Sequence, residues 1–380
     1  MRLRTHLCVL VVAVASSAAN SQLIWLDPIN PNQPVIAKAY GQAPNSGYVV
    51  GQGWPGGLPL DWGYGTTPTP ITNAQGQARD ASYITGNNPF YICGAVQGQP
   101  GYWTAPGYSW TPLPHLNPQY PIGIALATSY DGRVMVGQSR IGPNNAHRRA
   151  ARWVGDPMTG NYTVQNLGSF GGDSIAHDCS EAGDAVAGTA RYASGLERAF
   201  YWHNSMANPM IDLGHPFDPG LNLESFATGI SPVPGLGGYV VVGGYWNPAV
   251  AGWMPGWWEE SMLTTLTPYM KPLPLPGGFK GGVATKASGF LYGGPTWKKH
   301  RIVGWGVTTG NVLRALVWDR TPMNGYVAID LSSAVGVNPN TERLHRAVSV
   351  SHDGRIIVGE GARKVGNQWV GWAFKVILPL

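Results

Sequence analysis

The fold is decided by the stretch Ala127-Thr128-Ser129-Tyr130-Asp131-Gly132, which continues as Arg133-Val134-Met135-Val136-Gly137-Gln138-Ser139. After a polar loop come Ala150-Ala151-Arg152-Trp153 and then Leu167-Gly168-Ser169-Phe170-Gly171-Gly172. The Asp-Gly step is a tight-hairpin signal, because glycine adopts positive φ without steric cost. The Val-rich run after it and the tryptophan further on are typical of buried strands. This stretch therefore predicts a unit of short antiparallel strands joined by turns.

The same unit recurs along the chain. The next copy contains Gly183-Asp184-Ala185-Val186-Ala187-Gly188-Thr189 and Arg198-Ala199-Phe200-Tyr201-Trp202, and the last copy contains Ala347-Val348-Ser349-Val350-Ser351-His352-Asp353-Gly354 and Gly371-Trp372-Ala373-Phe374. The glycine that closes each Val-rich strand marks the register at seven positions, 43 to 61 residues apart: Gly51, Gly94, Gly137, Gly188, Gly243, Gly304 and Gly359. This spacing is typical of a four-stranded propeller blade that is lengthened where loops such as 268–282 intrude.

These repeats predict an all-β fold, a β-propeller of about seven four-stranded blades, with six or eight blades as the alternatives. Alanine and serine suit the crowded inner strands, and tryptophan or phenylalanine on the third strand packs against the next blade. Leu23-Ile24-Trp25-Leu26 has no blade of its own, while the last unit ends at Leu380 with room for about three strands. We therefore expect the N-terminal strand to pair with the last blade and close the ring.

The N-terminus has the features of a signal peptide over residues 1–19. Arg2 and Arg4 form a positive region, residues 7–15 are apolar, and small residues lead up to Ala19. The apolar run is too short to span a bilayer, and no later stretch is long and apolar enough to be a membrane anchor. We expect cleavage near Ala19 and a single propeller domain over 20–380. The predicted location is extracellular, with the periplasm as the alternative.

The composition narrows the classes of function. The chain has 53 Gly, 32 Pro and 16 Trp, and only 12% of its residues are charged. Without Arg2 and Arg4, 23 basic residues stand against 20 acidic ones, a net charge of +3. This excess is too small to indicate binding to nucleic acid or to an anionic membrane. Cys93 and Cys179 fall in blades two and four, which are not neighbours, so we expect buried thiols and not a disulfide.

Leu167 to Trp202 carries the pattern Leu-Gly-x-x-Gly-Gly-x-Ser, Ala, Gly-x-x-Val-x-Gly and Arg-Ala-Phe-x-Trp. This pattern resembles the extracellular HAF repeat family, found in exported bacterial proteins. Ala150-Ala151-Arg152-Trp153 and Arg314-Ala315-Leu316-Val317-Trp318 keep its shape without the His-Ala-Phe that names the family, and the first two and the fifth units match poorly. The resemblance covers about 250 residues. It implies a secreted, propeller-like protein with no assigned reaction.

We find no sequence motif of a known catalytic or metal centre: no Gly-x-Ser-x-Gly, His-Glu-x-x-His, Cys-x-x-Cys or phosphate-binding loop. The strongest polar cluster is His177-Asp178-Cys179, expected on an inner strand with side chains alternating between channel and blade interior. On the channel side, His177 or Cys179 could hold a metal or activate a nucleophile. In the structural interpretation, Asp178 or Ser180 makes turn hydrogen bonds and Cys179 packs. We predict no catalytic residue, no metal and no cofactor.

Two further sets of carboxylates have simpler explanations. Glu259 and Glu260 follow Trp257-Trp258, and paired carboxylates beside aromatics suit glycoside hydrolysis. Adjacent residues on a strand point to opposite faces, however, so these two cannot flank one bond. Recurrent acids near the first hairpin are explained by turn formation better than by calcium binding: Asp131, Asp184 and Asp353.

Tryptophans outside the blade period form the remaining candidate site. Trp54, Trp62, Trp103 and Trp110 lie in the densest Gly/Pro-rich segments, where exposed indoles would stack on sugar rings. The alternative is that they anchor loops to the blades. We predict a monomeric, non-enzymatic scaffold, either structural or binding a glycan, surface polymer or protein partner through these aromatic loops. The alternative is a carbohydrate-active hydrolase or lyase with its acids, or His, Tyr and Arg, gathered in the central channel.

Overall fold

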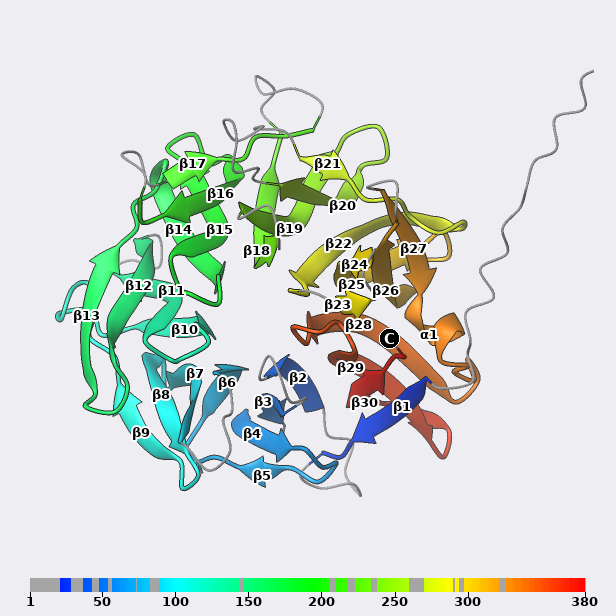
Figure 1. Cartoon of the computed structure of the whole chain (residues 1–380), viewed down its shortest axis with the longest axis horizontal. Coiled ribbons are helices and arrows are strands. Elements are labelled where there is room, and N and C mark those ends of the chain that lie inside the picture. Colours follow the sequence, from blue (N-terminus) through cyan, green and yellow to red (C-terminus); the bar gives the residue numbers. More distant parts are fainter. Residues whose placement is uncertain are drawn as a thin grey trace, which may run out of the picture.

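Seven four-stranded antiparallel sheets stand around a common axis in the computed structural model of the chain, which is a seven-bladed β-propeller (Figure 1). This confirms the predicted fold class and blade count. The structure describes residues 21–28, 37–42, 48–53, 57–72, 74–82, 89–143, 147–205, 210–216, 223–233, 238–259, 270–289, 291–293, 297–321 and 325–379. The predicted signal peptide, residues 1–19, lies outside these ranges.

The strands of each blade follow one another in chain order, with the first strand innermost (Figure 1). Blades 1 to 3 consist of β2 (Ala37–Gln42), β3 (Val49–Gly53), β4 (Leu58–Gly63) and β5 (Thr69–Pro70); β6 (Gly76–Ala81), β7 (Phe90–Val96), β8 (Gln99–Ala105) and β9 (Ser109–Pro112); and β10 (Gly123–Thr128), β11 (Val134–Arg140), β12 (Arg148–Asp156) and β13 (Asn161–Asn166). Blades 4 and 5 consist of β14 (Gly171–Cys179), β15 (Ala185–Tyr192), β16 (Glu197–His203) and β17 (Met210–Asp212); and β18 (Ser225–Val233), β19 (Gly238–Asn247), β20 (Gly252–Glu259) and β21 (Lys271–Pro272). Blades 6 and 7 consist of β22 (Phe279–Ala287), β25 (Arg301–Thr308), β26 (Leu313–Arg320) and β27 (Tyr326–Asp330); and β28 (Glu342–Val350), β29 (Ile356–Val365), β30 (Gln368–Ile377) and β1 (Gln22–Leu26).

Two small elements are added to blade 6. The hairpin of β23 (Leu291–Gly293) and β24 (Trp297–Lys299) is inserted between the first and second strands, and helix α1 (Leu331–Ala334) follows the fourth. The hairpin accounts for the long repeat here. Residues 271–272 and 279–282, which we expected in an intruding loop, belong instead to the strands β21 and β22. No helix in the described part of the chain is long and apolar enough to cross a membrane.

The turn between the first two strands of a blade explains the recurring Ser and Asp-Gly. In blade 3, Ser129 Oγ donates to Asp131 Oδ1 at 2.8 Å and accepts from Val134 N at 2.9 Å. Gly132 has a φ of 74°, which favours glycine. The equivalent serine-to-aspartate bonds are Ser180–Asp184 in blade 4 and Ser351–Asp353 in blade 7, both 2.6 Å. The recurrent aspartates therefore build turns, as predicted.

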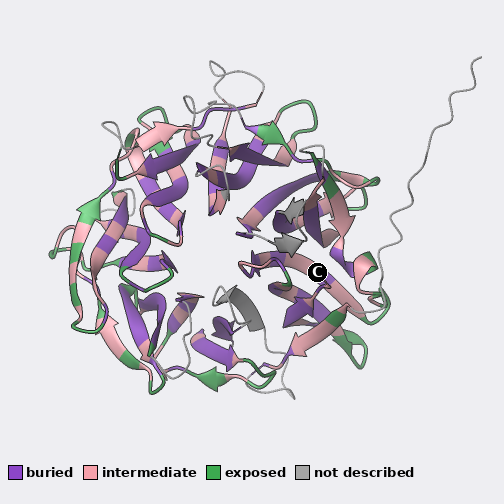
Figure 2. Cartoon of the chain, in the orientation of Figure 1, coloured by how far each residue is buried: buried purple, intermediate pink, exposed green. Residues whose placement is uncertain are grey.

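The apolar side chains of the described residues form seven clusters, and each cluster lies between two neighbouring blades. Between blades 3 and 4, for example, Val136 packs in one cluster with Phe200 and Trp202. Figure 2 shows buried residues concentrated on the inner and middle strands of the ring. A blade thus buries its faces only against its neighbours, which is why the ring has to close.

The tryptophans that follow the blade period lie on third strands, as predicted. In three blades the buried indole Nε1 donates to a backbone carbonyl in the segment that leads in from the preceding blade. These bonds are Trp153 to Pro114 at 2.7 Å, Trp258 to Leu213 at 2.6 Å and Trp318 to Pro274 at 2.6 Å. Each tryptophan therefore fills an inter-blade cluster and also fixes the entry of the chain into its blade.

The ring closes through the N-terminal strand, which confirms the predicted pairing. β1 pairs antiparallel with β30, from Gln22 opposite Ile377 to Leu26 opposite Ala373. Leu26 is fully buried in the cluster between blades 7 and 1. Trp25 Nε1 donates to Glu342 Oε1 at 2.8 Å and so ties the same strand to β28.

Candidate functional site

A β-bulge interrupts the innermost strand of every blade at the same level. In blade 4, Ala176 pairs with Gly188 and the next paired residue is Asp178, so His177 is the extra residue of the bulge. The seven equivalent alanine–glycine pairs are Ala39–Gly51, Ala78–Gly94, Ala125–Gly137, Ala176–Gly188, Ala227–Gly243, Ala284–Gly304 and Ala347–Gly359. A Cβ at Gly188 would lie 2.1 Å from the carbonyl oxygen of Ile175. Glycine at this position therefore permits the close approach that the bulge requires.

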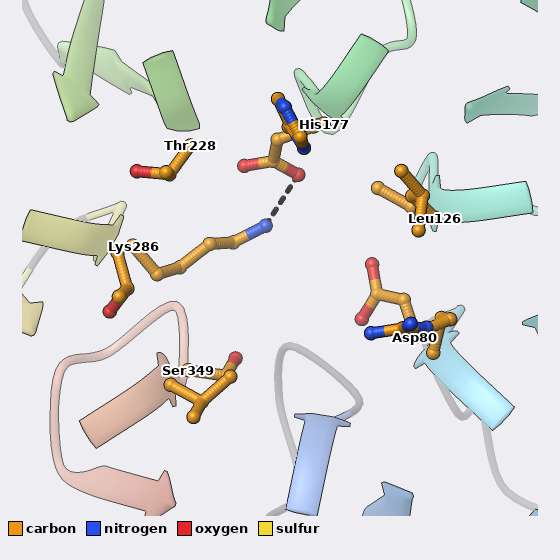
Figure 3. A pocket seen from close by; sticks show the side chains of 11 residues that line it. Asp80, Leu126, His177, Thr228, Lys286 and Ser349 are labelled. Carbon is orange, nitrogen blue, oxygen red and sulfur yellow. Dashed lines mark hydrogen bonds and ion pairs between the residues drawn. The ribbon is translucent and has the colours of Figure 1, made fainter. Parts of the chain in front are cut away.

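The bulge turns two successive side chains toward the axis. In a regular strand His177 and Asp178 would point to opposite faces, as the sequence led us to expect. That expectation is wrong because the extra residue re-aims the side chains, and both line one cavity of about 230 Å³ (Figure 3). We call this cavity the chamber. Its lining residues are Arg79, Asp80, Leu126, Ala127, His177, Asp178, Thr228, Thr285, Lys286, Val348 and Ser349.

An ion pair crosses the chamber between blades 4 and 6. Lys286 Nζ lies 2.6 Å from Asp178 Oδ1 (Figure 3). The other oxygen, Asp178 Oδ2, accepts from Ile230 N of blade 5 at 2.8 Å. Asp178 is 2% exposed, and a carboxylate buried to this degree needs such partners to stay ionised. Both oxygens of Asp178 are thus engaged by the protein itself.

Asp80 enters the chamber from blade 2. Its Oδ2 accepts from Thr128 N of blade 3 at 3.3 Å. Burial raises the pKa of Asp80 to about 6, although Lys286 acts in the opposite direction. Burial opposes the charge on Lys286, but the carboxylates of Asp178 and Asp80 outweigh it and raise the pKa of the ammonium. Burial also raises the pKa of Asp178, while Lys286 and the backbone N–H groups of Ile230 and Cys179 act in the opposite direction. The chamber thus brings together the carboxyl groups of Asp80 and Asp178, the ammonium of Lys286 and the guanidinium of Arg79.

His177 adds a neutral imidazole to this set. Burial lowers its pKa to about 4, and the charge of Arg79 adds to the effect. A neutral ring offers one hydrogen-bond donor and one acceptor to a ligand. As for the metal role considered from the sequence, no group of three or more His, Cys, Asp or Glu that could hold a metal ion occurs among the residues the structure describes.

Two threonines of the chamber serve the scaffold. Thr228 Oγ1 donates to the carbonyl oxygen of Ala284 at 2.7 Å, and Thr285 Oγ1 donates to that of Ala347 at 2.8 Å. Each hydroxyl sits at a bulge and reaches the inner strand of the next blade. These bonds hold the inner strands of blades 5, 6 and 7 together around the chamber.

A second ion pair crosses the channel at the level of the turns. Glu181 of blade 4 and His352 of blade 7 each follow the serine that comes directly after their inner strand, and Glu181 Oε1 contacts His352 Nδ1. This hydrogen bond raises the pKa of His352 above its ordinary value, against the effect of burial. A cavity of about 50 Å³ is lined by this pair together with Asp80 and Lys286, which also line the chamber. Such a volume is sufficient for ordered water.

The two cysteines of the described chain are free and buried. Burial raises the pKa of both the Cys93 and the Cys179 thiol well above the ordinary value. A protonated thiol is a poor nucleophile. Cys179 packs in the cluster between blades 3 and 4, which agrees with the structural interpretation of the His177-Asp178-Cys179 stretch.

The expectation that Trp62, Trp103 and Trp110 lie in loops outside the blade period is wrong. Trp62 and Trp103 lie on the third strands β4 and β8, like the tryptophans of the other blades, and Trp110 lies on β9. Trp62 is 2% exposed and its Nε1 donates to Asp27 O at 2.8 Å. Trp103 is 1% exposed, and its ring lies 4.6 Å from that of the half-buried Trp110. Neither Trp62 nor Trp103 thus has an indole face open to a ligand. Trp54 lies outside the described residues.

Glu259, which follows Trp257-Trp258, does not line the chamber. Glu259 lies 3.3 Å from Arg320 Nη2 and 3.9 Å from Lys271 Nζ. Glu260 lies outside the described residues. Sequence reasoning singled out His177 and Asp178 but missed Arg79, Asp80 and Lys286 as their neighbours. The signal that could have found them is the glycine inside each second strand, since such a glycine often marks a bulge opposite it.

The fold and the chamber together define a seven-bladed propeller with a charged central cavity. The sequence matches no protein-family model and no curated protein. Similar solved structures include the tricorn protease, with 9% identity over 92% of this chain and 35% of that one and a TM-score of 0.50. TolB from Acinetobacter baumannii is 15% identical over 76% of this chain and 59% of its own, with a TM-score of 0.39. A protein of unknown function from Dyadobacter fermentans is 10% identical over 94% of this chain and 99% of its own, with a TM-score of 0.44. This chain spans about a third and three fifths of the first two proteins, and the likeness concerns the fold alone.

Proposed function

We propose that this chain is an exported β-propeller scaffold that binds a ligand in its central channel, at the chamber. The observation that carries the proposal is the convergence of Arg79, Asp80, His177, Asp178 and Lys286 on one cavity. Only 12% of the chain is charged, so this concentration of ionisable groups is unusual for the molecule. Burying such groups costs free energy that a purely structural channel would avoid with apolar side chains. Concave sites with converging polar groups are where proteins bind small ligands.

Filling the chamber tests this proposal. Leu126→Trp places a large indole at a bulge on its wall, and Val327→Trp makes the same kind of change at a residue that is 52% exposed on the outer strand β27. Wild type and both variants are screened by thermal shift against polysaccharides and their monomer units. A ligand that shifts the melting temperature of wild type and Val327→Trp but not of Leu126→Trp supports the chamber. Equal shifts in all three proteins would place the site elsewhere.

A hydrolase or lyase is the second candidate, because acids gathered in the channel are what that function requires. Glycoside hydrolysis needs one carboxyl group as acid and a second as base or nucleophile. Asp178 has both oxygens engaged by Lys286 and Ile230, which favours binding over hydrolysis. Reducing-end release from the same polysaccharides tests this candidate. Release that Asp80→Asn abolishes, without a change in the unfolding midpoint, would make the chain an enzyme.

Export is the other part of the proposal. It is supported by the signal-peptide features of residues 1–19 and by the resemblance to the exported HAF repeat proteins. The test is to express the protein with its natural N-terminus in a bacterial host and to analyse the protein found outside the cytoplasm by mass spectrometry. We expect a chain that begins near residue 20. A full-length chain retained in the cytoplasm would contradict it.

A further inference from the structure

We infer that the chamber binds a neutral, polyhydroxylated ligand of about the size of one sugar ring, and that it discriminates against ligands with a full charge. The inference rests on the proposed function, which places the ligand in the channel, and adds the chemical class of that ligand. A free monosaccharide and the terminal unit of a glycan share this chemistry.

The volume of the chamber sets the size of the ligand. Pockets for drug-sized molecules usually have roughly 300 to 1,000 Å³. The chamber has about 230 Å³, so it fits a smaller molecule. The aliphatic side chains of Leu126 and Val348 lie on its wall beside the polar groups. A sugar ring presents C–H groups and hydroxyls at the same time, and so suits a lining of this mixed kind.

The charges of the chamber are balanced, which favours a neutral ligand. Two cations, Arg79 and Lys286, face two carboxylates, Asp80 and Asp178, while His177 is neutral at pH 7. An anionic ligand would be repelled by the two carboxylates, and a cationic ligand would be repelled by Arg79 and Lys286. Neither would gain from neutralising an unbalanced charge, because the chamber has none. Like charges brought together in this way lower affinity and are a common basis of specificity.

The charges are also interleaved, which disfavours a zwitterion. Arg79 and Asp80 are successive residues of β6, and Lys286 is bonded to Asp178. An amino acid needs a cationic pole and an anionic pole that are separated, so that its two charges meet opposite partners. Hydroxyl groups donate to a carboxylate and accept from a cation, so several of them around one ring match an alternating set of charges.

Asp80 is the acceptor best placed to bind such hydroxyls. A carboxylate accepts about four hydrogen bonds. Asp80 uses two of these with the backbone N–H groups of Thr128 and Ala81, so it has further acceptor positions. Asp178, in contrast, serves Lys286 and the backbone N–H groups of Ile230 and Cys179. Hydrogen bonds to a charged acceptor are about twice as strong as neutral ones, so Asp80 has a large share in the affinity.

The test uses calorimetry on the mature full chain with three sets of probes: neutral methyl glycosides, the corresponding uronic acids, and α-amino acids. We expect the glycosides to bind more tightly than the other two sets, and Asp80→Asn to weaken them at least about tenfold, or 1.4 kcal/mol. Asp131→Asn is the matched control, because Asp131 is 56% exposed in a turn outside the chamber and Asn keeps its acceptor oxygen. The affinity for a methyl glycoside is also compared with the affinity for a polysaccharide that is end-labelled at the same unit. This comparison shows whether the ligand is a free sugar or the end of a glycan chain.

A pH series on unaltered protein checks the same point without a variant. Protonation of Asp80 below pH 6 removes an acceptor and leaves the chamber with an extra positive charge, so glycoside binding weakens from pH 7.5 to pH 5 while uronate binding strengthens. The titratable groups around Asp80 are Arg79, Cys93, His177, Asp178, Cys179, Glu181, Lys286 and His352. In Asp80→Asn the loss of glycoside binding between pH 7.5 and pH 5 must be smaller than in the unaltered protein, because the remaining titratable groups alone then contribute.

The outcomes separate the two proposals. Tighter binding of uronates or amino acids that Leu126→Trp abolishes overturns the ligand class and leaves the channel site standing. Glycoside binding that Leu126→Trp leaves unchanged overturns the channel site. No binding of any probe at millimolar concentration overturns the ligand class, and the polysaccharide screen then decides on the site.

Discussion

Glycine at the second-strand position lets each inner strand bulge, since an added methyl group would overlap the backbone opposite. At Gly188 a Cβ would lie 2.1 Å from Ile175 O and 2.7 Å from the ring of Phe200. Because Gly188 has no side chain, the strand opposite it can bulge, and the bulge turns the side chains of His177 and Asp178 toward the channel. The channel chemistry depends on residues that do not themselves touch the channel.

Gly188→Ala is expected to lower the free energy of unfolding by about 2 to 3 kcal/mol, because neither the carbonyl nor the packed ring can move away without strain. Urea denaturation followed by tryptophan fluorescence measures the loss. Gly277→Ala is the control, since a Cβ there meets no atom within 4 Å. Equal midpoints for the two variants would show that the bulge does not require glycine.

Lys286→Met is expected to destabilise the protein by about 3 to 5 kcal/mol, because it leaves the buried Asp178 carboxylate without its partner. The loss is smaller at pH 5 than at pH 8, since protonation of Asp178 removes the uncompensated charge. Adding Asp178→Asn should restore part of the stability. A double variant that is no more stable than the single one would indicate that the lysine acts through packing alone.

At the scale of elements, the inner strand shows what sequence can and cannot predict. The glycine of the second strand repeats in all seven blades, because the bulge opposite it leaves no room for a Cβ, and the spacing of this glycine led to the blade count. The bulge residue does not repeat: it is Arg79, Leu126, His177, Thr228, Thr285 or Val348 among the described side chains. A position that varies gives no periodic signal. The prediction that Trp62 and Trp103 are exposed was wrong for a different reason. It relied on the Gly/Pro content around them, whereas the burial of a side chain depends on the neighbouring blade.

The turns that carry Glu181 and His352 give a prediction of pH dependence. The Glu181 partner raises the pKa of His352, so its stabilisation is complete below the unfolded value of about 6.5 and is lost as pH rises through the folded value. Both side chains are about a third exposed, at 35% and 34%, so the effect is on the order of 0.5 to 1 kcal/mol.

Urea titrations of wild type and Glu181→Gln at pH 6 and pH 9 measure this difference, which should be present at pH 6 and absent at pH 9. Glu197→Gln is the control, because it removes an ion pair with Arg191, whose charge does not change in this range. A gap between wild type and Glu181→Gln that stays constant with pH would argue against a charged His352.

At the scale of the whole molecule, each of the seven hydrophobic clusters formed by the described residues is shared by two blades, so each blade depends on the integrity of the ring. A chain that begins at residue 29 lacks β1 and with it Trp25 and Leu26. We expect it to lose about 5 kcal/mol or more and to bind a hydrophobic dye, because the edge of β30 and one cluster are exposed. Calorimetry against a chain that begins at residue 20 measures the loss, and identical melting curves would show that closure is dispensable.

The pairing of β1 with β30 also sets an order in time. The residues of β1 are synthesised first, but their partners are residues 373–377, at the other end of the chain. At about 5 to 20 residues per second, β1 waits roughly 20 to 70 seconds for the strand it binds. Until then the ring is open, and the cluster between blades 7 and 1 lacks part of its side chains. The strand that is synthesised first, β1, is therefore the last to pair.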